Sequence, residues 1–287
     1  MNGFFLIDKP EGKTSSNVVI NIKKNLKLKK CGHNGTLDPN TTGLMVVGCN
    51  EATKLMKFIN EHDKAYITTI IFGMDSNTLD IYGNISEDFE MNFSEKDLDQ
   101  ALSKIQLMTK QIPPMVSAIK IDGKKLYELE RNNIEVAIEA RDIKIDKITK
   151  LSNLRKVDGH LEIDLEIQCS KGFYVRSFAR DLGALLGGKA IMKKLRRIRS
   201  GEFYVDNAIS LEDVSIDKMI SIEELFPNFD KLVVNDYISK LAYNGVVFDE
   251  RQIKTDKPFY VYNRNKMIAI YEPVGEYKYK PVIIFKE

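Results

Sequence analysis

The stretch CGHNGTLDPNTTGLMVVGCNEATKL, residues 31–55, has a single aspartate, Asp38, near its centre. Glycines on either side allow turns and close approaches that larger residues resist, while Pro39 favours an extended backbone at the aspartate. The apolar run Leu44–Val47 then indicates a strand. The stretch thus predicts a loop that holds a carboxylate in place, followed by a strand and a helix start. Its Asn-Gly pair is equally typical of an ordinary turn, so the local chemistry leaves a catalytic and a structural role open.

Length and composition restrict the class of protein. A chain of 287 residues has room for about two domains. With 43% hydrophobic and 29% charged residues it is typical of a soluble globular protein, and no apolar run approaches the roughly 20 residues of a membrane span. The N-terminus has no signal-peptide pattern. We therefore expect a cytoplasmic protein with no membrane partner. A monomer is the default expectation.

Cysteine usage and charge give two further expectations. Cys31, Cys49 and Cys169 are scattered, which fits reduced thiols rather than a disulfide framework, and no His/Cys spacing indicates a metal site. A net charge of +2 conceals two basic segments, residues 23–30 and 189–199. Such runs are either solvated faces or contacts to a polyanion, and the sequence alone leaves both open.

Hydrophobic periodicity predicts strands and helices in mixed order, with strict alternation at 161–169 and a capped amphipathic helix at 94–107. Strands are also expected at 4–7 and 65–72, and helices from about 15 to 26, at 51–60 and at 176–186. This order favours an α+β fold around a mixed, largely antiparallel sheet. The proline- and lysine-containing stretch at 111–131 interrupts the pattern as a long excursion. From 231 the chain becomes β-rich, so we expect domains at 1–230 and 231–287.

Five blocks, in order, resemble the TruB-type family of bacterial tRNA pseudouridine-55 synthases. They are LIDKPEGKTSSNVV (6–19), GHNGTLDPNTTGLMVVGCNEATK (32–54), DKAY (63–66), QIPPMVSAIKIDGKKLYELER (111–131) and CSKGFYVRSFARDLG (169–183). The resemblance implies the pseudouridine-synthase fold, an RNA-binding thumb at about 111–133 and, by position, a small C-terminal domain of PUA type. A generic small β domain is nearly as good an interpretation of that last segment.

The implied activity is the conversion of uridine 55 in the T-arm loop of tRNA to pseudouridine. In this reaction the flipped base loses its glycosidic bond, rotates and reattaches through C5, and neither a metal nor another cofactor is required. Asp38 matches the family's catalytic aspartate, acting as nucleophile or base. The sequence leaves open whether it attacks C1′, adds to the base or removes the C2′ proton.

Arg176 matches the family's active-site arginine, and burial would otherwise raise the pKa of the catalytic carboxyl group, so this cation would keep Asp38 ionised. Asp80 matches an acid that orients Arg176. The family's T-D-T-x-D pattern is broken there, because Asn77 replaces its first aspartate. Tyr66 matches the family's active-site tyrosine, which would stack on the uracil and assist proton removal from C5.

The remaining candidates share an implied role in binding RNA. His33 would insert where the flipped base leaves, and Leu195 would contact the base. The others are the pocket-lining Lys9, Pro10 and Tyr174, the thumb residues Lys120 and Lys124, and the phosphate contacts Lys193 and Arg196.

Three alternative functions compete with this interpretation. A non-catalytic RNA-binding or tRNA-folding protein would keep the pocket without needing the carboxylate. A phosphotransferase of the haloacid-dehalogenase type would need a D-x-D motif after a strand, whereas Asp38 precedes one and Asn40 takes the second position. The guide-RNA-dependent branch of the same superfamily shares the core motifs, but the compact length and bacterial-type thumb favour a stand-alone enzyme.

Overall fold

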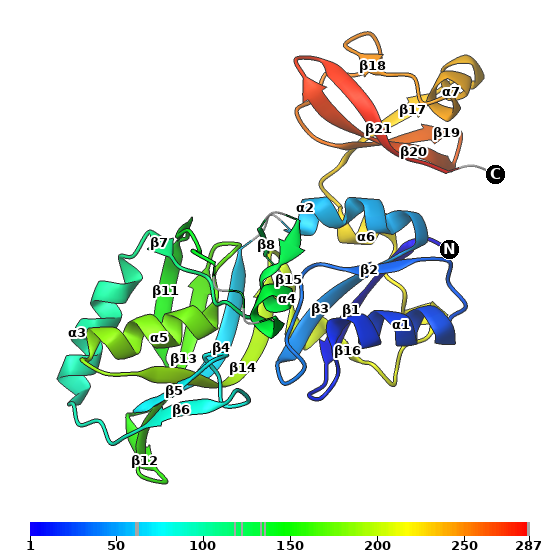
Figure 1. Cartoon of the computed structure of the whole chain (residues 1–287). Helices are drawn as coiled ribbons and strands as arrows, with labels where there is room; N and C mark the ends of the chain where they lie inside the picture. The colour runs from blue at the N-terminus through cyan, green and yellow to red at the C-terminus, as the bar shows by residue number, and fades with distance from the viewer. Residues whose placement is uncertain (61–62, 118, 122, 133, 135, 286–287) are drawn as a thin grey trace.

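The computed structural model describes residues 1–60, 63–117, 119–121, 123–132, 134 and 136–285. A large sheet with its covering helices and a smaller, separate C-terminal sheet make up most of the molecule (Figure 1). None of the helices within these ranges is both long and apolar enough to span a bilayer.

The large sheet has ten strands. Its neighbours pair antiparallel except for β14–β3 and β1–β16, which are parallel, so the predicted mixed, largely antiparallel sheet is confirmed. The main path runs β11 (Ile145–Lys150), β13 (His160–Cys169), β4 (Lys64–Phe72), β14 (Ala190–Ser200), β3 (Thr42–Cys49), β1 (Gly3–Lys9) and β16 (Ile209–Ser210). Three short strands pair at its sides: β12 (Arg155–Val157), β15 (Phe203–Tyr204) and β2 (Cys31–His33).

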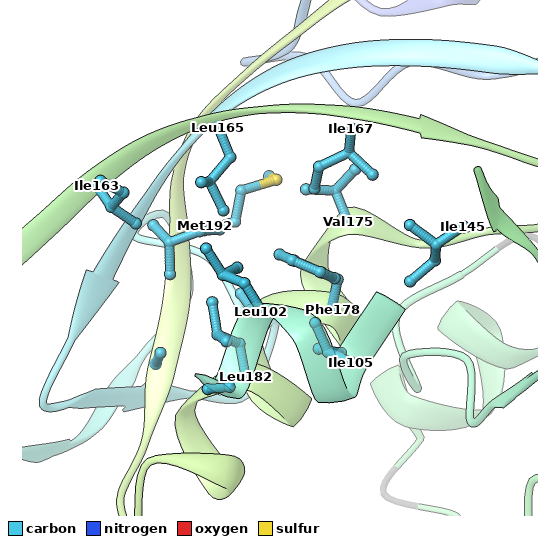
Figure 2. Packing of buried hydrophobic residues seen from close by; sticks show 14 of the residues in the cluster. Leu102, Ile105, Ile145, Ile163, Leu165, Ile167, Val175, Phe178, Leu182 and Met192 are labelled. Atoms are coloured by element: carbon cyan, nitrogen blue, oxygen red, sulfur yellow. The ribbon is translucent and has the colours of Figure 1, made fainter. Parts of the chain in front are cut away.

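Three hydrophobic clusters cover this sheet, one on the β11–β14 half and two on the β1–β3 half, where the second includes residues of the C-terminal sheet. On the β11–β14 half, α3 (Glu95–Gln106) and α5 (Val175–Leu185) pack their apolar faces against the strands, as Figure 2 shows for Leu102, Phe178 and Leu165. On the β1–β3 half, α1 (Ser15–Asn25) contributes Val18 and Ile22. Each of these helices buries apolar side chains that repeat at helical spacing, and this burial stabilises the helix.

The predicted cap of the helix at 94–107 is confirmed. The Ser94 side chain accepts from the backbone N–H of Asp97 while the Asp97 carboxylate accepts from that of Ser94, a complete capping box. Thr14 caps α1 by accepting from the backbone of Asn17. The helix expected at 51–60 is a 3₁₀ turn, η1 (Asn50–Leu55), that continues into α2 (Met56–Asn60).

The two halves of the sheet meet where β14 pairs with the start of β3. Only Arg196↔Thr42 and Arg197↔Gly43 are in register there. Gly43 has φ +104°, and a Cβ atom on it would lie 2.2 Å from the carbonyl oxygen of Arg197. Only glycine therefore permits this approach, which brings the end of the Asp38 loop against the middle of β14.

Smaller elements connect the main strands. They are the hairpin of β5 (Met74–Ser76) and β6 (Ile85–Asp88), the pair β7 (Lys110–Gln111) and β10 (Arg141–Asp142), the 3₁₀ turns η2 (Val205–Asn207) and η3 (Ile216–Lys218), and α6 (Ile222–Leu225). The excursion at 111–131 contains the hairpin β8 (Lys120–Ile121) and β9 (Lys124–Lys125), then α4 (Leu126–Arg131). The side chains of the candidates Lys120 and Lys124 lie outside the described part of the structure.

The C-terminal β domain is a five-stranded sheet with one helix. Its order is β17 (Asp230–Val234), β19 (Phe259–Asn263), β20 (Lys266–Gly275), β21 (Lys278–Ile284) and β18 (Phe248–Asp249), with α7 (Asp236–Tyr243) packed beside it. Stacked rings of Phe248, Tyr271 and Phe259 fill its core. Tyr260 donates a hydrogen bond to the carbonyl of Phe226, which ties this domain to α6. The predicted boundary at 230/231 and the PUA type stay predictions.

Candidate active site

Asp38 lies in the loop between β2 and β3, and several hydrogen bonds from the first 15 residues fix that loop. The Ser15 hydroxyl accepts from the Leu37 amide at 2.8 Å and donates to the Leu37 carbonyl at 3.0 Å. The carbonyl of Pro39 accepts from the Gly12 amide at 2.9 Å and from the Lys9 ammonium at 3.0 Å. The backbone on both sides of Asp38 is therefore anchored.

Arg176, at the start of α5, reaches the carboxylate of Asp38. Its Nη2 lies 3.1 Å from Asp38 Oδ2, and the arginine side chain is only 9% exposed against 43% for the aspartate. The same guanidinium donates to the carbonyls of Thr78 and Val116, each at 3.0 Å. Three contacts in different directions fix the planar group, so its charge stays beside Asp38.

Asp80 stands behind this pair. Its Oδ2 is 4.0 Å from Arg176 Nε, while its Oδ1 accepts from the Thr78 hydroxyl at 2.7 Å and the Tyr82 amide at 3.0 Å. Asn77, the departure from the family pattern, accepts instead from the Asn84 amide at 2.9 Å. Asp80 is therefore oriented by contacts that do not involve Asn77.

A cavity of about 380 Å³ opens beside the carboxylate. The structure brings five predicted residues together in its wall: Asp38, Tyr66, Tyr174, Arg176 and Leu195. A smaller cavity of about 150 Å³ shares Asp38, Arg176 and Leu195 with the first and adds Asp80 and Lys193. The carboxylate thus faces a hollow with aromatic and aliphatic walls, the kind of site that suits a planar ring.

Two tyrosines line the larger cavity. Tyr66 on β4 is buried, and burial raises its pKa to about 12, although the Arg197 guanidinium opposes this shift. Tyr174 precedes α5, and its pKa is also raised by burial. Both phenols are therefore neutral at neutral pH, and both residues line the cavity.

Arg197 is a residue of the cavity wall that sequence reasoning missed. It is 1% exposed, and its Nε donates to the carbonyl of Leu44 at 2.7 Å. Nη2 makes longer contacts of 3.5 Å to Asn34 Oδ1 and to the Gly35 carbonyl. No carboxylate lies within ion-pair distance of it among the residues described, and burial lowers its pKa. A buried cation thus holds the Asp38 loop through neutral oxygens.

Asn34 extends this buried network. Its amide nitrogen donates to the Ser200 hydroxyl at 2.8 Å, and its amide oxygen accepts from the Val46 amide at 3.0 Å. The signal that could have identified Arg197 is strand alternation. Positions 195 and 197 of β14 both line the cavity, as two residues on one strand face do, whereas position 196 does not.

The other candidates lie nearby but make different contacts. His33 on β2 is half-buried; its Nδ1 accepts from the Gly35 amide at 3.2 Å, and burial lowers its pKa, so the ring is neutral. Lys9 is buried under the Asp38 loop and does not line either cavity. Pro10 lines a separate hollow near Asn21.

Two basic candidates are already paired with acids. Arg196 makes a bidentate contact with Asp8, at 3.0 and 2.7 Å, and Lys193 forms an ion pair with the buried Glu162. Within the described ranges no cluster of three or more His, Cys, Asp or Glu side chains is suited to hold a metal ion.

Comparisons with known proteins agree with this geometry. Residues 23–175 match the model of the TruB family pseudouridylate synthase N-terminal domain, and 176–229 match that of the tRNA pseudouridylate synthase B C-terminal domain. The tRNA pseudouridine synthase B of Aster yellows witches'-broom phytoplasma is 38% identical over 99% of this chain and 100% of its own length. That of Acholeplasma laidlawii is also 38% identical, over 98% and 99%.

Solved structures give the same fold. The structure of a Cbf5–Nop10–Gar1 complex matches with a TM-score of 0.68 at 22% identity, covering 99% of this chain and 84% of that one. The predicted pseudouridine-synthase fold is confirmed. With two matching family models and relatives that align over nearly the whole length, the chain belongs to the TruB family of pseudouridylate synthases.

Proposed function

We propose that this protein is a tRNA pseudouridine synthase that isomerises uridine 55 in the T-arm loop. The observation that carries the proposal is the Asp38–Arg176 pair at the wall of a cavity lined by Tyr66 and Tyr174. Relatives named tRNA pseudouridine synthase B over nearly the full chain support tRNA as the substrate class.

The reaction breaks the bond from C1′ to N1 and makes one from C1′ to C5, then moves the C5 proton off the ring while N1 gains one. The Arg176 guanidinium pairs with the Asp38 carboxylate and orients it, so the carboxylate can act as nucleophile or base at the nucleotide. The uracil would have to stay in the cavity while it rotates, so that C5 can be joined to C1′.

Tyr66, Tyr174 and Leu195 would hold the base between aromatic and aliphatic surfaces. Tyr66 would also take part in removal of the C5 proton. With a pKa of about 12, Tyr66 carries its proton at neutral pH and can act as a base only as its anion, which a nearby positive charge stabilises. Arg197 is the direct cross-strand partner of Tyr66, and we propose that it supplies this charge as well as holding the loop.

Substrate binding would draw on the elements around the cavity. His33 would fill the gap that the flipped base leaves, since base stacking is worth about 1–3 kcal/mol and offsets much of the cost of flipping. The excursion at 111–133, with Lys120 and Lys124, and the domain at 231–287, as a PUA-type module, would contact the rest of the T-arm. Lys193 and Arg196 would exchange their acidic partners for phosphates. We propose that the enzyme acts as a cytoplasmic monomer, which light scattering on the free protein would test.

The experiment is to incubate an unmodified full-length tRNA transcript with the protein and to map pseudouridine by carbodiimide adduct formation and reverse transcription. We expect one new stop, at position 55, and none with Asp38→Asn. A transcript with cytidine at position 55 is the control. Pseudouridine elsewhere in the transcript would contradict the assigned position, and its absence everywhere would contradict the function.

A further inference from the structure

Two cysteines face each other across the hairpin that carries the Asp38 loop. Cys31 on β2 is in register with Cys49 on β3, in an antiparallel pairing. The Asn50 amide donates to the Lys30 carbonyl at 2.7 Å. Lys30 and Asn50 are therefore a hydrogen-bonded pair, and the neighbouring Cys31 and Cys49 are a non-hydrogen-bonded pair. Pairs of this kind have Cα atoms about 4.5 Å apart and bring their side chains closest together.

The two sulfur atoms are already in contact. Sγ of Cys31 and Sγ of Cys49 are 3.9 Å apart and share a hydrogen bond. Disulfides span Cα separations of roughly 4.4–6.8 Å, a range that includes this type of cross-strand pair. To become bonded, the sulfur atoms must close from 3.9 Å to about 2.05 Å, which draws the start of β2 toward β3.

The environments of the two thiols differ in a way that suits stepwise oxidation. Cys31 is half-buried and within reach of solvent, whereas Cys49 is fully buried behind it. The hydrogen bond with Cys49 lowers the pKa of Cys31 against the effect of burial, and the Lys23 ammonium adds to the lowering, while the pKa of Cys49 is raised. The outer thiol is the better nucleophile and the inner one is placed to resolve it.

We propose that Cys31 and Cys49 form a modification site at which a peroxide produces a reversible intrachain disulfide that slows catalysis. The Cys31 thiolate attacks one peroxide oxygen, the O–O bond breaks, and a sulfenic acid and hydroxide result. The Cys49 thiol then attacks the Cys31 sulfur, the S–O bond breaks, and water leaves. The two thiols are oxidised by two electrons and the peroxide is reduced.

The disulfide would affect catalysis because β2 is short, so Cys31 lies close to the Asp38 loop. The strand ends at His33, and the next residue, Asn34, belongs to the buried network with Arg197. Movement of Cys31 toward Cys49 displaces this strand at its base. Displacements of about 1 Å near a reacting centre cost on the order of 10²-fold in rate, so we expect the oxidised protein to be roughly tenfold slower. The expected loss of activity rests on the proposed function, whereas the formation of the disulfide does not.

The test uses the full chain, treated with hydrogen peroxide, quenched with catalase, denatured and alkylated with iodoacetamide. Intact mass should show three alkyl groups on the untreated protein, one per cysteine, and a single one, on Cys169, after oxidation. Dithiothreitol should restore all three together with the activity. Cys31→Ser is the matched control, because the substitution is small and half-exposed; it should carry two groups before and after peroxide and keep its activity.

Three alkyl groups after peroxide, or oxygen addition at Cys31 without loss of the Cys49 thiol, would overturn the modification site. A disulfide that forms with unchanged activity would overturn its effect on catalysis. If the untreated protein already lacks synthase activity, the proposed function fails, while the mass measurement still decides whether the disulfide forms.

Discussion

Two buried arginines reach the Asp38 loop from different elements, and they do so in different ways. Arg176, at the start of α5, meets a carboxylate and two carbonyls. Arg197, in the middle of β14, contacts a carbonyl at 2.7 Å and more distant neutral oxygens of the loop. We infer that the first orients the carboxylate of Asp38 and that the second controls the shape of the backbone that presents it.

The largest effect is expected at Arg176. In Arg176→Met the Asp38 carboxylate loses its cation, and we expect the single-turnover rate to fall about 10²- to 10³-fold, as when one charge-stabilising group is removed from an active site. Arg176→Lys should recover only part of the rate, because an ammonium cannot copy the planar set of contacts. Quench-flow on a T-arm hairpin measures both. An unchanged rate in Arg176→Met would remove the arginine from the chemistry.

Replacing Arg197 should lower both the stability of the fold and the rate of the reaction. Arg197→Met leaves the Leu44 carbonyl without its donor, and we expect a loss of about 2 kcal/mol in the free energy of unfolding. The rate should fall roughly tenfold because the loop shifts. Urea unfolding and single-turnover kinetics measure the two quantities. A loss of rate in Arg197→Met with no loss of stability would contradict this role for Arg197.

The activity should depend on pH through Lys9, whose ammonium group donates to the carbonyl of Pro39 in the same loop. Burial lowers its pKa from 10.5 to about 8, although Asp38 and Glu11 oppose the shift. Below pH 8 the ammonium has a proton for each of the carbonyls of Pro10, Lys13 and Pro39. Above it the amine has only two, so we expect activity to decline as pH rises through about 8.

The effect of Lys9 on stability has the opposite pH dependence to its effect on activity, so the two can be distinguished. The unfolded chain keeps the Lys9 proton up to about pH 10.5, so between the two values it binds more protons than the folded chain. This group therefore makes the folded state more stable as pH rises, and lost activity there is not unfolding caused by Lys9. The rate profile of Lys9→Arg, which cannot lose its proton, should stay flat across pH 8. A decline as steep as in the native protein would assign the effect to another group.

The smallest effect is expected at Asn77. Its side chain does not contact Asp80, which is held by Thr78 and Tyr82. Asn77→Asp would restore the aspartate of the family pattern, yet the rate should change less than about twofold, since surface substitutions are usually worth within about 0.5 kcal/mol. Steady-state kinetics measure this. A large gain would mean that Asn77 weakens the support of Arg176.

The sequence predicted the parts of the site that carry ordered motifs. Asp38, Tyr66 and Arg176 come from three distant blocks, and the structure brings them to one cavity. The capped helix at α3 and the alternating strand at β13 were also predictable, because their signals are local.

Arg197 and the partners of the other basic residues were not predictable in the same way. Charged residues on both faces of β14 hide its alternation, so the segment looked like one basic cluster. Arginine is almost never fully buried without a carboxylate, and the oxygens that compensate Arg197 lie about 150 residues earlier in the chain. Asp8, the partner of Arg196, is also far from it in the sequence. Glu162, the partner of Lys193, lies on another strand, so this contact depends on how the strands are aligned.

The most direct test is tritium release from a T-arm hairpin labelled at uridine C5, comparing the native protein with Asp38→Asn at equal RNA binding. We predict that the native protein releases tritium in proportion to the pseudouridine formed and that Asp38→Asn, still held by Arg176 through its amide oxygen, releases none above background. Release by Asp38→Asn at the native rate would contradict a catalytic Asp38. Binding without release by either protein would contradict the synthase function itself.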